Sequence, residues 1–281
     1  MRVISMLDDY RKMCNSAENQ GKYEAYKIYA AKYPTLFKAV EKYLYNSSLE
    51  NLKDYIEGCN LKALLHQGEA NYDNGLFNRI PDYVEKCSKR IGIDFPFDLY
   101  LGLELGNIGG ASLPEENGNQ FVYIGMDRPV DSEFCTFFVP HELHHLLRIH
   151  STGETDSITL KARMVSEGLA SYCPIWIEDL KWNTETIALS LGIKQKSAQY
   201  MLEHADSLIK ELWTEGGKSL NQEIMMRFFT TSNEDDNVCV PGYFVGMWLT
   251  HALVEQGYSY MKLTNMNTPE VLSLMGDLIE K

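Results

Sequence analysis

Long apolar runs are missing from this chain of 281 residues. No stretch approaches the roughly 20 consecutive apolar residues that a membrane-spanning helix requires. The N-terminal segment reaches Asp8 and Asp9 before any apolar run of the length that a signal peptide carries. These two absences argue against membrane insertion and against secretion, so we expect a cytoplasmic protein with no membrane partner.

Paired cysteines and basic clusters are missing too. The six cysteines lie singly with no CxxC pair, which is typical of reduced intracellular thiols and not of a disulfide framework. Lysine and arginine together number 26 against 39 aspartates and glutamates, a formal net charge of -13. Because this charge repels a phosphate backbone and no basic run offsets it locally, we expect no nucleic-acid partner.

The composition that remains is that of an ordinary folded protein. Hydrophobic residues make up 44% of the chain and charged residues 23%, a balance typical of globular domains. A length of 281 residues fits one large domain or two closely packed ones. We therefore expect a folded, enzyme-sized protein, whose oligomeric state the sequence does not indicate.

The spacing of apolar residues divides the chain into a helical lead, a short sheet and a second helical region. Over residues 1–88 apolar residues recur at three- and four-residue spacings, interrupted by joints rich in Pro or Asn, which predicts helices. Apolar residues alternate with other residues over 99–105, and this period of two predicts a half-buried strand. A second strand is expected over 121–126, and after residue 131 the helical pattern returns.

We therefore predict an α+β fold that is mostly α. The expected organisation is a helical N-terminal region over 1–94 and a second domain over 95–281, with a small β-sheet of at least two strands. Gly109 and Gly110, between the strands, are either a flexible connection or a place where a ligand approaches the backbone closely. The pair Asn117-Gly118 predicts a turn.

One segment carries a motif with clear chemistry. Residues 139–147, VPHELHHLL, contain the pattern HExxH, and Pro140 suits the first turn of a helix. Residues four apart on a helix share a face, so His141 and His145 can both reach one zinc ion at roughly 2.0–2.1 Å. Glu142 points near the same metal and can take a proton from water that zinc has acidified, which makes it the candidate general base.

A third metal ligand must come from elsewhere, because a catalytic zinc normally has three protein ligands and one open position. We expect Glu167, in the segment RMVSEGLA, to be that ligand. Its apolar neighbours Val165 and Leu169 predict a buried helix, in which an inward-facing carboxylate is costly unless it is paired or metal-bound. Gly168 is unfavourable inside a helix by about 1 kcal/mol, which makes sense if the metal-binding helix packs closely against it.

Three other residues compete for this role: His150, Glu154 and Asp156, all in the segment after the motif helix. His150 fits poorly, because in the pattern HExxHxxGxxH the last histidine follows a glycine, at an interval of six, whereas here the interval is five and Arg148 replaces the glycine. Asp156 resembles the aspartate ligand of other zincins only loosely. The remaining histidine, His144, cannot share the metal face, so we expect it to make a polar contact beside the motif.

The sequence HELHH followed by SEGLASY resembles the glutamate-ligand zincins, the gluzincin group of metallopeptidases. More narrowly, it resembles a bacterial family of predicted Zn-dependent proteases with an HExxH motif and a downstream EGLA. The similarity runs from about Leu99 to the C-terminus and includes the late segment PGYFVG, whereas the helical lead lies outside it. The resemblance implies a zincin-like metallopeptidase domain with Zn2+ as cofactor, held by His141, His145 and Glu167, and with Glu142 as base.

The resemblance also implies how a substrate and its oxyanion are held. In this group the strands upstream of the motif form an edge along which an extended peptide lies, and here residues 99–126 would supply it. The group that stabilises the oxyanion would be Tyr243 or His251. Tyr243 lies in the first turn of a helix expected to begin at Pro241, a position that also fits a core tyrosine whose hydroxyl bonds to backbone.

These features predict a zinc-dependent hydrolase, in particular a peptidase that cleaves a peptide or protein substrate through metal-activated water. The alternative is a zinc-binding regulatory or interaction protein that keeps the zincin fold without efficient peptidase activity. The two candidates for the oxyanion partner and the helical lead leave this alternative open. A helical protein in which the motif is accidental would bind no zinc at all.

Overall fold

The computed structural model describes residues 1–114, 119–154, 158–230 and 239–280. The chain separates into two compact units, Met1–Cys135 and Thr136–Lys281. The predicted division at residues 94 and 95 stays a prediction about domains, and the compact units follow a different boundary. The expected turn at Asn117-Gly118 lies outside the described residues.

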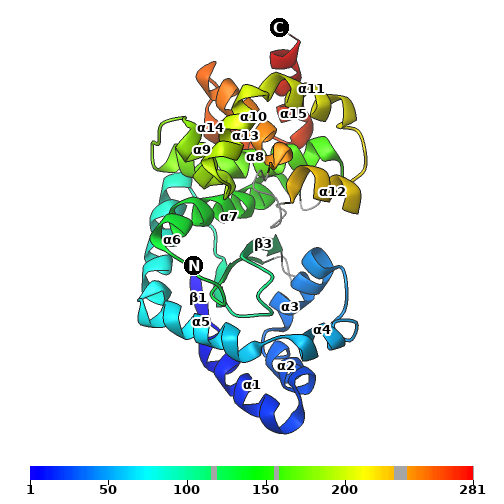
Figure 1. Ribbon diagram of the computed structural model, residues 1–281. Helices are drawn as coiled ribbons and strands as arrows, with labels where there is room; N and C mark the ends of the chain where they lie inside the picture. Colours follow the sequence, from blue (N-terminus) through cyan, green and yellow to red (C-terminus); the bar gives the residue numbers. More distant parts are fainter. Residues whose placement is uncertain (115–118, 155–157, 231–238, 281) are drawn as a thin grey trace. The chain divides into compact units, whose positions relative to one another are not determined.

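The first unit combines helices with a sheet (Figure 1). Its helices are α1 (Leu7–Gln20), α2 (Lys22–Ala30), α3 (Pro34–Val40), the π-helix η1 (Glu41–Tyr45), α4 (Lys53–Gly58), α5 (Leu61–Asp73) and α6 (Leu76–Ile91). Aromatic side chains from α1, α2 and α3 form the core between them: Tyr29 meets Tyr10 edge-on at a ring-centroid distance of 5.3 Å and Phe37 at 5.8 Å. The helical spacing read from the sequence thus marks residues that pack together.

Four strands of the described chain form one sheet. They are β1 (Arg2–Ser5), β2 (Asp98–Gly102), β3 (Gly110–Pro114) and β4 (Gln120–Gly125), in the spatial order β1-β2-β4-β3. The pairs β1–β2 and β2–β4 are parallel, whereas β3–β4 is antiparallel. Both predicted strands are present, and a mostly helical α+β fold is confirmed. Of the strands described within residues 99–126, β3 lies at an edge of the sheet, whereas β2 and β4 each have a neighbour on both sides.

Two features of this unit differ from the sequence-based expectation. Strand β1 lies in a region expected to be helical, because four residues are too few to establish an alternating pattern and much of the strand is exposed. Gly109 and Gly110 belong to an ordered connection, since the N–H of Gly125 donates to the Gly109 carbonyl at 2.7 Å and Gly110 begins β3. A Cβ on Gly125 would lie 2.2 Å from the Ile108 carbonyl oxygen, so the close backbone approach needs glycine there.

Helix α7 (Ser132–Thr152) carries the motif and starts in the last residues of the first unit. Asp131 caps it, because its side chain accepts the N–H of Phe134 at 2.7 Å. The expectation that Pro140 stands in the first turn is wrong, because the cap lies nine residues earlier and Pro140 is inside the helix. A proline there removes one main-chain hydrogen bond, which the rest of a 21-residue helix tolerates.

Helices dominate the described residues of the second unit, which also contain one isolated β-bridge between Thr159 and Ser219. Its further helices are α8 (Leu160–Ile177), α9 (Thr184–Leu191), α10 (Gln195–Glu203), α11 (Ala205–Glu215), α12 (Gln222–Phe229), α13 (Pro241–Glu255), α14 (Tyr260–Asn265) and α15 (Thr268–Ile279). Helices α8 and α13 pack at backbone contact: a Cβ on Gly168 would lie 2.2 Å from the Gly246 carbonyl carbon. Gly168 therefore serves close packing as expected, but its partner is α13 and not the motif helix.

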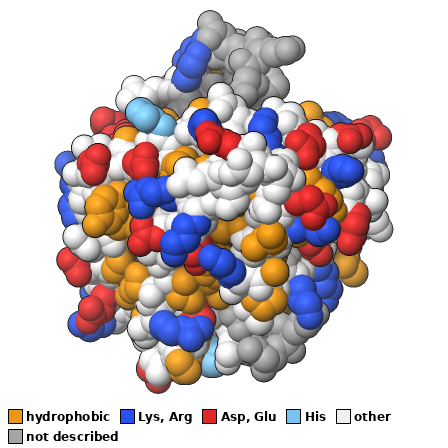
Figure 2. Space-filling model, turned by 90° about the horizontal axis from the view of Figure 1, so that it is seen from below, with side chains coloured by type: hydrophobic (Ala, Val, Ile, Leu, Met, Phe, Trp, Pro, Cys, Tyr) orange, Lys and Arg blue, Asp and Glu red, His pale blue; other side chains and the backbone are white. Residues whose placement is uncertain are grey.

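Two features of the whole chain concern the partners expected from the sequence. None of the helices in the described ranges combines the length and the apolar character that a membrane span demands. On the face drawn in Figure 2, lysine and arginine side chains lie interspersed with aspartate and glutamate side chains. Charges of both signs thus share that face.

Candidate metal centre

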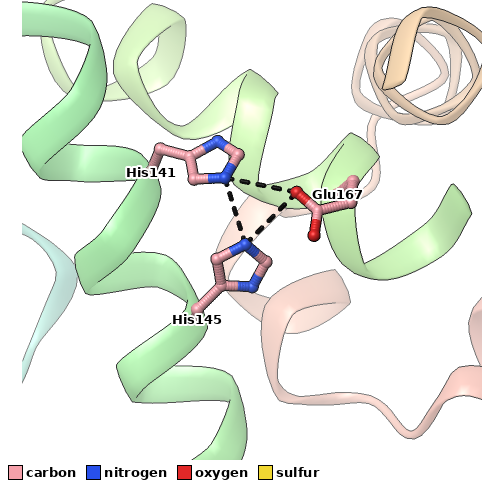
Figure 3. Close-up of side chains that lie close together, drawn as sticks. All are labelled: His141, His145 and Glu167. Carbon is pink, nitrogen blue, oxygen red and sulfur yellow. Dashed lines mark hydrogen bonds and ion pairs between the residues drawn. The ribbon is translucent and has the colours of Figure 1, made fainter. Parts of the chain in front are cut away.

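The two histidines of the motif lie one turn apart on α7 and present their rings to the same side (Figure 3). The Nε2 atoms of His141 and His145 are 3.1 Å apart, and the ring centroids are 4.8 Å apart. Two neutral imidazoles each carry one acceptor nitrogen, so a cation between the rings would bind both. The helical spacing alone produces this pair.

Glu167 of α8 completes a group of three ligands. Its Oε2 atom lies 3.3 Å from Nε2 of His141 and 3.4 Å from Nε2 of His145, and its side chain is buried. The donor atoms of these three residues all lie within 4.8 Å of one another (Figure 3). The structure thus brings together the three residues that the sequence analysis selected, although Glu167 lies 22 positions after His145 in the chain.

The donor set fits zinc. Two ligands at 2.0–2.1 Å from a tetrahedral ion lie roughly 3.3–3.4 Å apart, and the three separations here are 3.1, 3.3 and 3.4 Å. Two imidazoles and one carboxylate form a common ligand set of catalytic zinc sites, and three ligands leave the fourth position open. These residues could therefore hold a metal ion.

Electrostatics keep the carboxylate ionised. Burial would raise the pKa of Glu167, but the Arg163 guanidinium and His145 outweigh burial and hold that pKa well below its usual range. Nη2 of Arg163 lies 2.8 Å from Oε1 of Glu167, the oxygen that does not face the histidines. For His141, burial favours the neutral ring, but the hydrogen bond and the charge of Glu167 raise the pKa above its ordinary value. Glu167 thus presents an ionised oxygen to the two histidines, and a cation could share it with them.

Glu142, the predicted base, is buried with 6% of its surface exposed. It follows His141 directly on α7, and adjacent residues of a helix point in different directions. It is not one of the three clustered ligands. Its negative charge nevertheless raises the pKa values of His141, Arg163 and Tyr243, which places the carboxylate within electrostatic range of the cluster. A carboxylate in this position can accept a proton beside the metal site.

Tyr243, one of two candidates for the oxyanion partner, extends from the first turn of α13 to the cluster. Its ring centroid lies 6.5 Å from that of His141, and its hydroxyl is within hydrogen-bonding reach of the Arg163 guanidinium. The charge of Glu167, and then burial, raise its pKa, so the phenol keeps its proton. The hydroxyl therefore lies near a charged side chain of the site.

His251, the other candidate, is engaged elsewhere. Its ring stacks on Trp182 at a centroid distance of 4.1 Å and an interplanar angle of 12°, and its Nδ1 lies 3.4 Å from the Tyr172 hydroxyl. It is not part of the metal-binding group. Of the two candidates, the geometry favours Tyr243.

The rivals of Glu167 make other contacts or lie outside the described residues. Glu154 forms an ion pair with Arg148 at 3.0 Å and accepts the N–H of Thr268 at 2.9 Å. His150 is exposed and is not among the clustered ligands. Asp156 lies outside the described residues. Arg148 stands where the pattern HExxHxxGxxH has its glycine. It donates to main-chain carbonyls at the end of α14 and so links the motif helix to α14.

The expectation that His144 makes a polar contact is wrong for the described part of the chain. Its side chain is 1% exposed, neither ring nitrogen has a hydrogen-bond partner there, and its ring lies 6.0 Å from that of Tyr260. Burial lowers its pKa well below the ordinary value, so the ring is neutral. The face of α7 beside the metal ligands is therefore packed, which the motif pattern alone does not reveal.

Arg163 is the residue of this site that the sequence analysis missed. It precedes Glu167 by four residues, and a pair at this spacing meets on a helix surface. The same spacing rule that identified the two histidines would have found it.

Comparison with known proteins adds one match. The model of a family described as "Predicted Zn-dependent protease (DUF2268)" matches residues 100–273, a range that includes the motif helix, Glu167, Arg163 and Tyr243. Searches of the curated proteins and of the solved structures found no match.

Proposed function

Since the chain belongs to the family of predicted Zn-dependent proteases, we propose that it is a zinc-dependent peptidase whose metal is held by His141, His145 and Glu167. The observation that carries the proposal is the separation of 3.1–3.4 Å between the three donor atoms, which suits a tetrahedral zinc ion. Zinc bound by these residues would lower the pKa of water and polarise a carbonyl. The ligand set and the HExxH motif support a gluzincin-type site.

Glu142 is the general base of the proposed reaction. Its carboxylate accepts a proton from the water molecule that attacks the carbonyl carbon of the scissile peptide bond. When the C–N bond breaks, the same carboxyl returns that proton to the leaving nitrogen, so the products are a carboxylic acid and an amine. The acid then passes its remaining proton to the amine, which gives a carboxylate and an ammonium group. Burial beside the cluster supports this role, because the proton then moves within a site largely shielded from bulk water.

Tyr243 stabilises the oxyanion. The attack of water leaves a negative charge on the former carbonyl oxygen, and a preorganised donor aimed at that oxygen lowers the barrier. The Tyr243 hydroxyl keeps its proton because its pKa is raised by Glu167 and by burial. It can therefore donate a hydrogen bond to the oxyanion.

The test compares the wild-type chain with Glu142→Gln, using zinc analysis and cleavage of a peptide library read by mass spectrometry. We expect the variant to keep one zinc per chain and to lose roughly 10²- to 10⁴-fold in kcat, the range attributed to general-base catalysis. Glu133→Gln, an exposed carboxylate in the first turn of the same helix, is the matched control and should leave both unchanged.

Three outcomes would contradict parts of the proposal or all of it. Wild-type turnover retained in Glu142→Gln would reject the assigned base. Stoichiometric zinc without cleavage of any library peptide would favour a zinc-binding regulatory protein over a peptidase. Absence of bound zinc, even after addition of excess metal, would overturn the proposal as a whole.

A further inference from the structure

Arg163 contacts two members of the proposed site at once. Its Nη2 atom lies 2.8 Å from Oε1 of Glu167, and its guanidinium is within hydrogen-bonding reach of the Tyr243 hydroxyl. Arg163 and Glu167 lie on α8 and Tyr243 in the first turn of α13, and the two helices pack at backbone contact at Gly168 and Gly246. About a third of the Arg163 side chain remains exposed, 35%. The residue is thus a bridge at the rim of the site and not a core side chain.

We infer that Arg163 is a positioning residue, which holds Glu167 as a one-oxygen metal ligand and orients the hydroxyl of Tyr243. The inference rests on the proposed function and deepens it. The two oxygens of Glu167 are divided between two partners: Oε1 faces Arg163, whereas Oε2 faces both histidines. A carboxylate free to rotate could bind a metal through both oxygens and fill the coordination position that water needs. The pairing with Arg163 prevents that rotation.

The contact with Tyr243 has a definite direction. Arginine carries only donor N–H groups, so the phenol oxygen must accept from Arg163. The phenol proton is then left to point to another acceptor. The positive charge also acts against the effect of Glu167 on the pKa of Tyr243. Arg163 therefore prepares the hydroxyl as a donor, the role that oxyanion stabilisation requires.

The planar guanidinium of Arg163 can do more than supply a positive charge. The guanidinium is planar with fixed donor directions, so one group serves both Glu167 and Tyr243. Lysine in its place would supply a point charge for Glu167 without the second, fixed direction. Arg163→Lys should therefore separate the two functions, and Arg163→Met should remove both.

The experiment measures zinc affinity by chelator competition and the visible absorption of the cobalt-substituted protein. We expect Arg163→Met to lower zinc affinity roughly 10- to 100-fold, the effect typical of partners that orient metal ligands, and to change the cobalt spectrum. Arg163→Lys should recover most of the zinc affinity. Arg227→Met is the matched control, because Arg227 pairs with Glu211 and Glu215 outside the metal-binding group, and it should change neither readout.

A double-mutant cycle tests the contact with Tyr243. Tyr243→Phe and Arg163→Lys should each lower kcat, and the double variant should lose little more than Tyr243→Phe alone. If the losses in kcat add in the double variant, Arg163 does not act through Tyr243. An unchanged zinc affinity and cobalt spectrum in Arg163→Met would overturn the inference. If the wild-type chain cleaves no peptide, the proposed function fails, while the zinc and cobalt measurements still decide whether Arg163 positions Glu167.

Discussion

Each compact unit buries carboxylates, but their surroundings differ. In the first unit, Oε1 of Glu104 accepts the N–H groups of Asn107 at 2.6 Å and Ile108 at 2.8 Å. Oδ2 of Asp127 accepts those of Glu104 at 2.8 Å and Gly106 at 3.1 Å. In the second unit, Glu167 faces two imidazoles and one guanidinium. Glu104 also accepts from the Tyr45 hydroxyl. Neutral donors, most of them backbone amides, thus bond the first pair, whereas imidazoles and a guanidinium surround the third carboxylate.

The direction of the pKa shifts follows these surroundings. Burial raises the pKa of Glu104 and of Asp127, and the hydrogen bonds that they accept offset this only in part. For Glu167 the positive neighbours outweigh burial and the pKa falls well below its usual range. The comparison teaches that burial of an acid does not by itself mark a site. Glu104 and Asp127 hold the connection between β2 and β3, whereas Glu167 offers an oxygen to a cation.

The largest expected effect is on zinc affinity. Glu167→Ala removes one of three ligands and should weaken zinc binding by more than the roughly 10- to 100-fold that outer partners contribute. Glu104→Met removes an equally buried carboxylate and should leave zinc affinity unchanged. Chelator competition on both variants measures this directly. An equal loss of zinc affinity in the two variants would break the comparison.

A smaller effect is expected on stability. In Glu104→Met the buried N–H of Ile108 loses its acceptor, and an unsatisfied buried donor costs about 1–3 kcal/mol. The free energy of unfolding, measured with urea and circular dichroism, should fall by this amount. Full stability in this variant would show that Glu104 does not hold the connection.

The smallest effect is a dependence of stability on pH. The pKa of Asp127 is raised above its ordinary value of 3.8, so the folded chain keeps a proton that the unfolded chain has already lost. This contribution to stability is complete below pH 3.8 and is lost as the pH rises through the raised pKa. Asp127→Asn does not titrate. Its stability relative to wild type should therefore grow as the pH rises above about 4 in urea titrations, and a decline would reverse the assigned shift.

The metal-binding cluster was predictable from the sequence because the two rules that identify its residues act over a few neighbouring positions. The spacing of His141 and His145 is a property of any α-helix, and it placed their Nε2 atoms 3.1 Å apart. Glu167 was selected because a carboxylate in an apolar helical segment needs a partner. Strand β2 followed from the alternating apolar residues over 99–105. The family match over residues 100–273 agrees with the resemblance read from HELHH and SEGLASY.

Other features could not be predicted from local rules. Strand β1 pairs with β2, whose residues lie 96 positions later in the sequence, and the four residues of β1 alone do not predict this pairing. The helix begins at the cap Asp131, well before Pro140, although a proline usually marks the first turn of a helix. The partner of Gly168 was assigned to the wrong helix, since a small residue shows that something packs closely but not which element does so.

The sequence by itself determined the helical pair of histidines, the adjacent Glu142 and a mostly helical α+β fold, because helix periodicity and strand alternation act over a few residues. Only the tertiary structure decided that Glu167 rather than Glu154 meets the histidines, that Tyr243 rather than His251 lies beside them, and that Arg163 joins Glu167 to Tyr243. Those pairings depend on how α7, α8 and α13 pack against one another, and packing is set by the whole set of side chains in the core and not by any one segment.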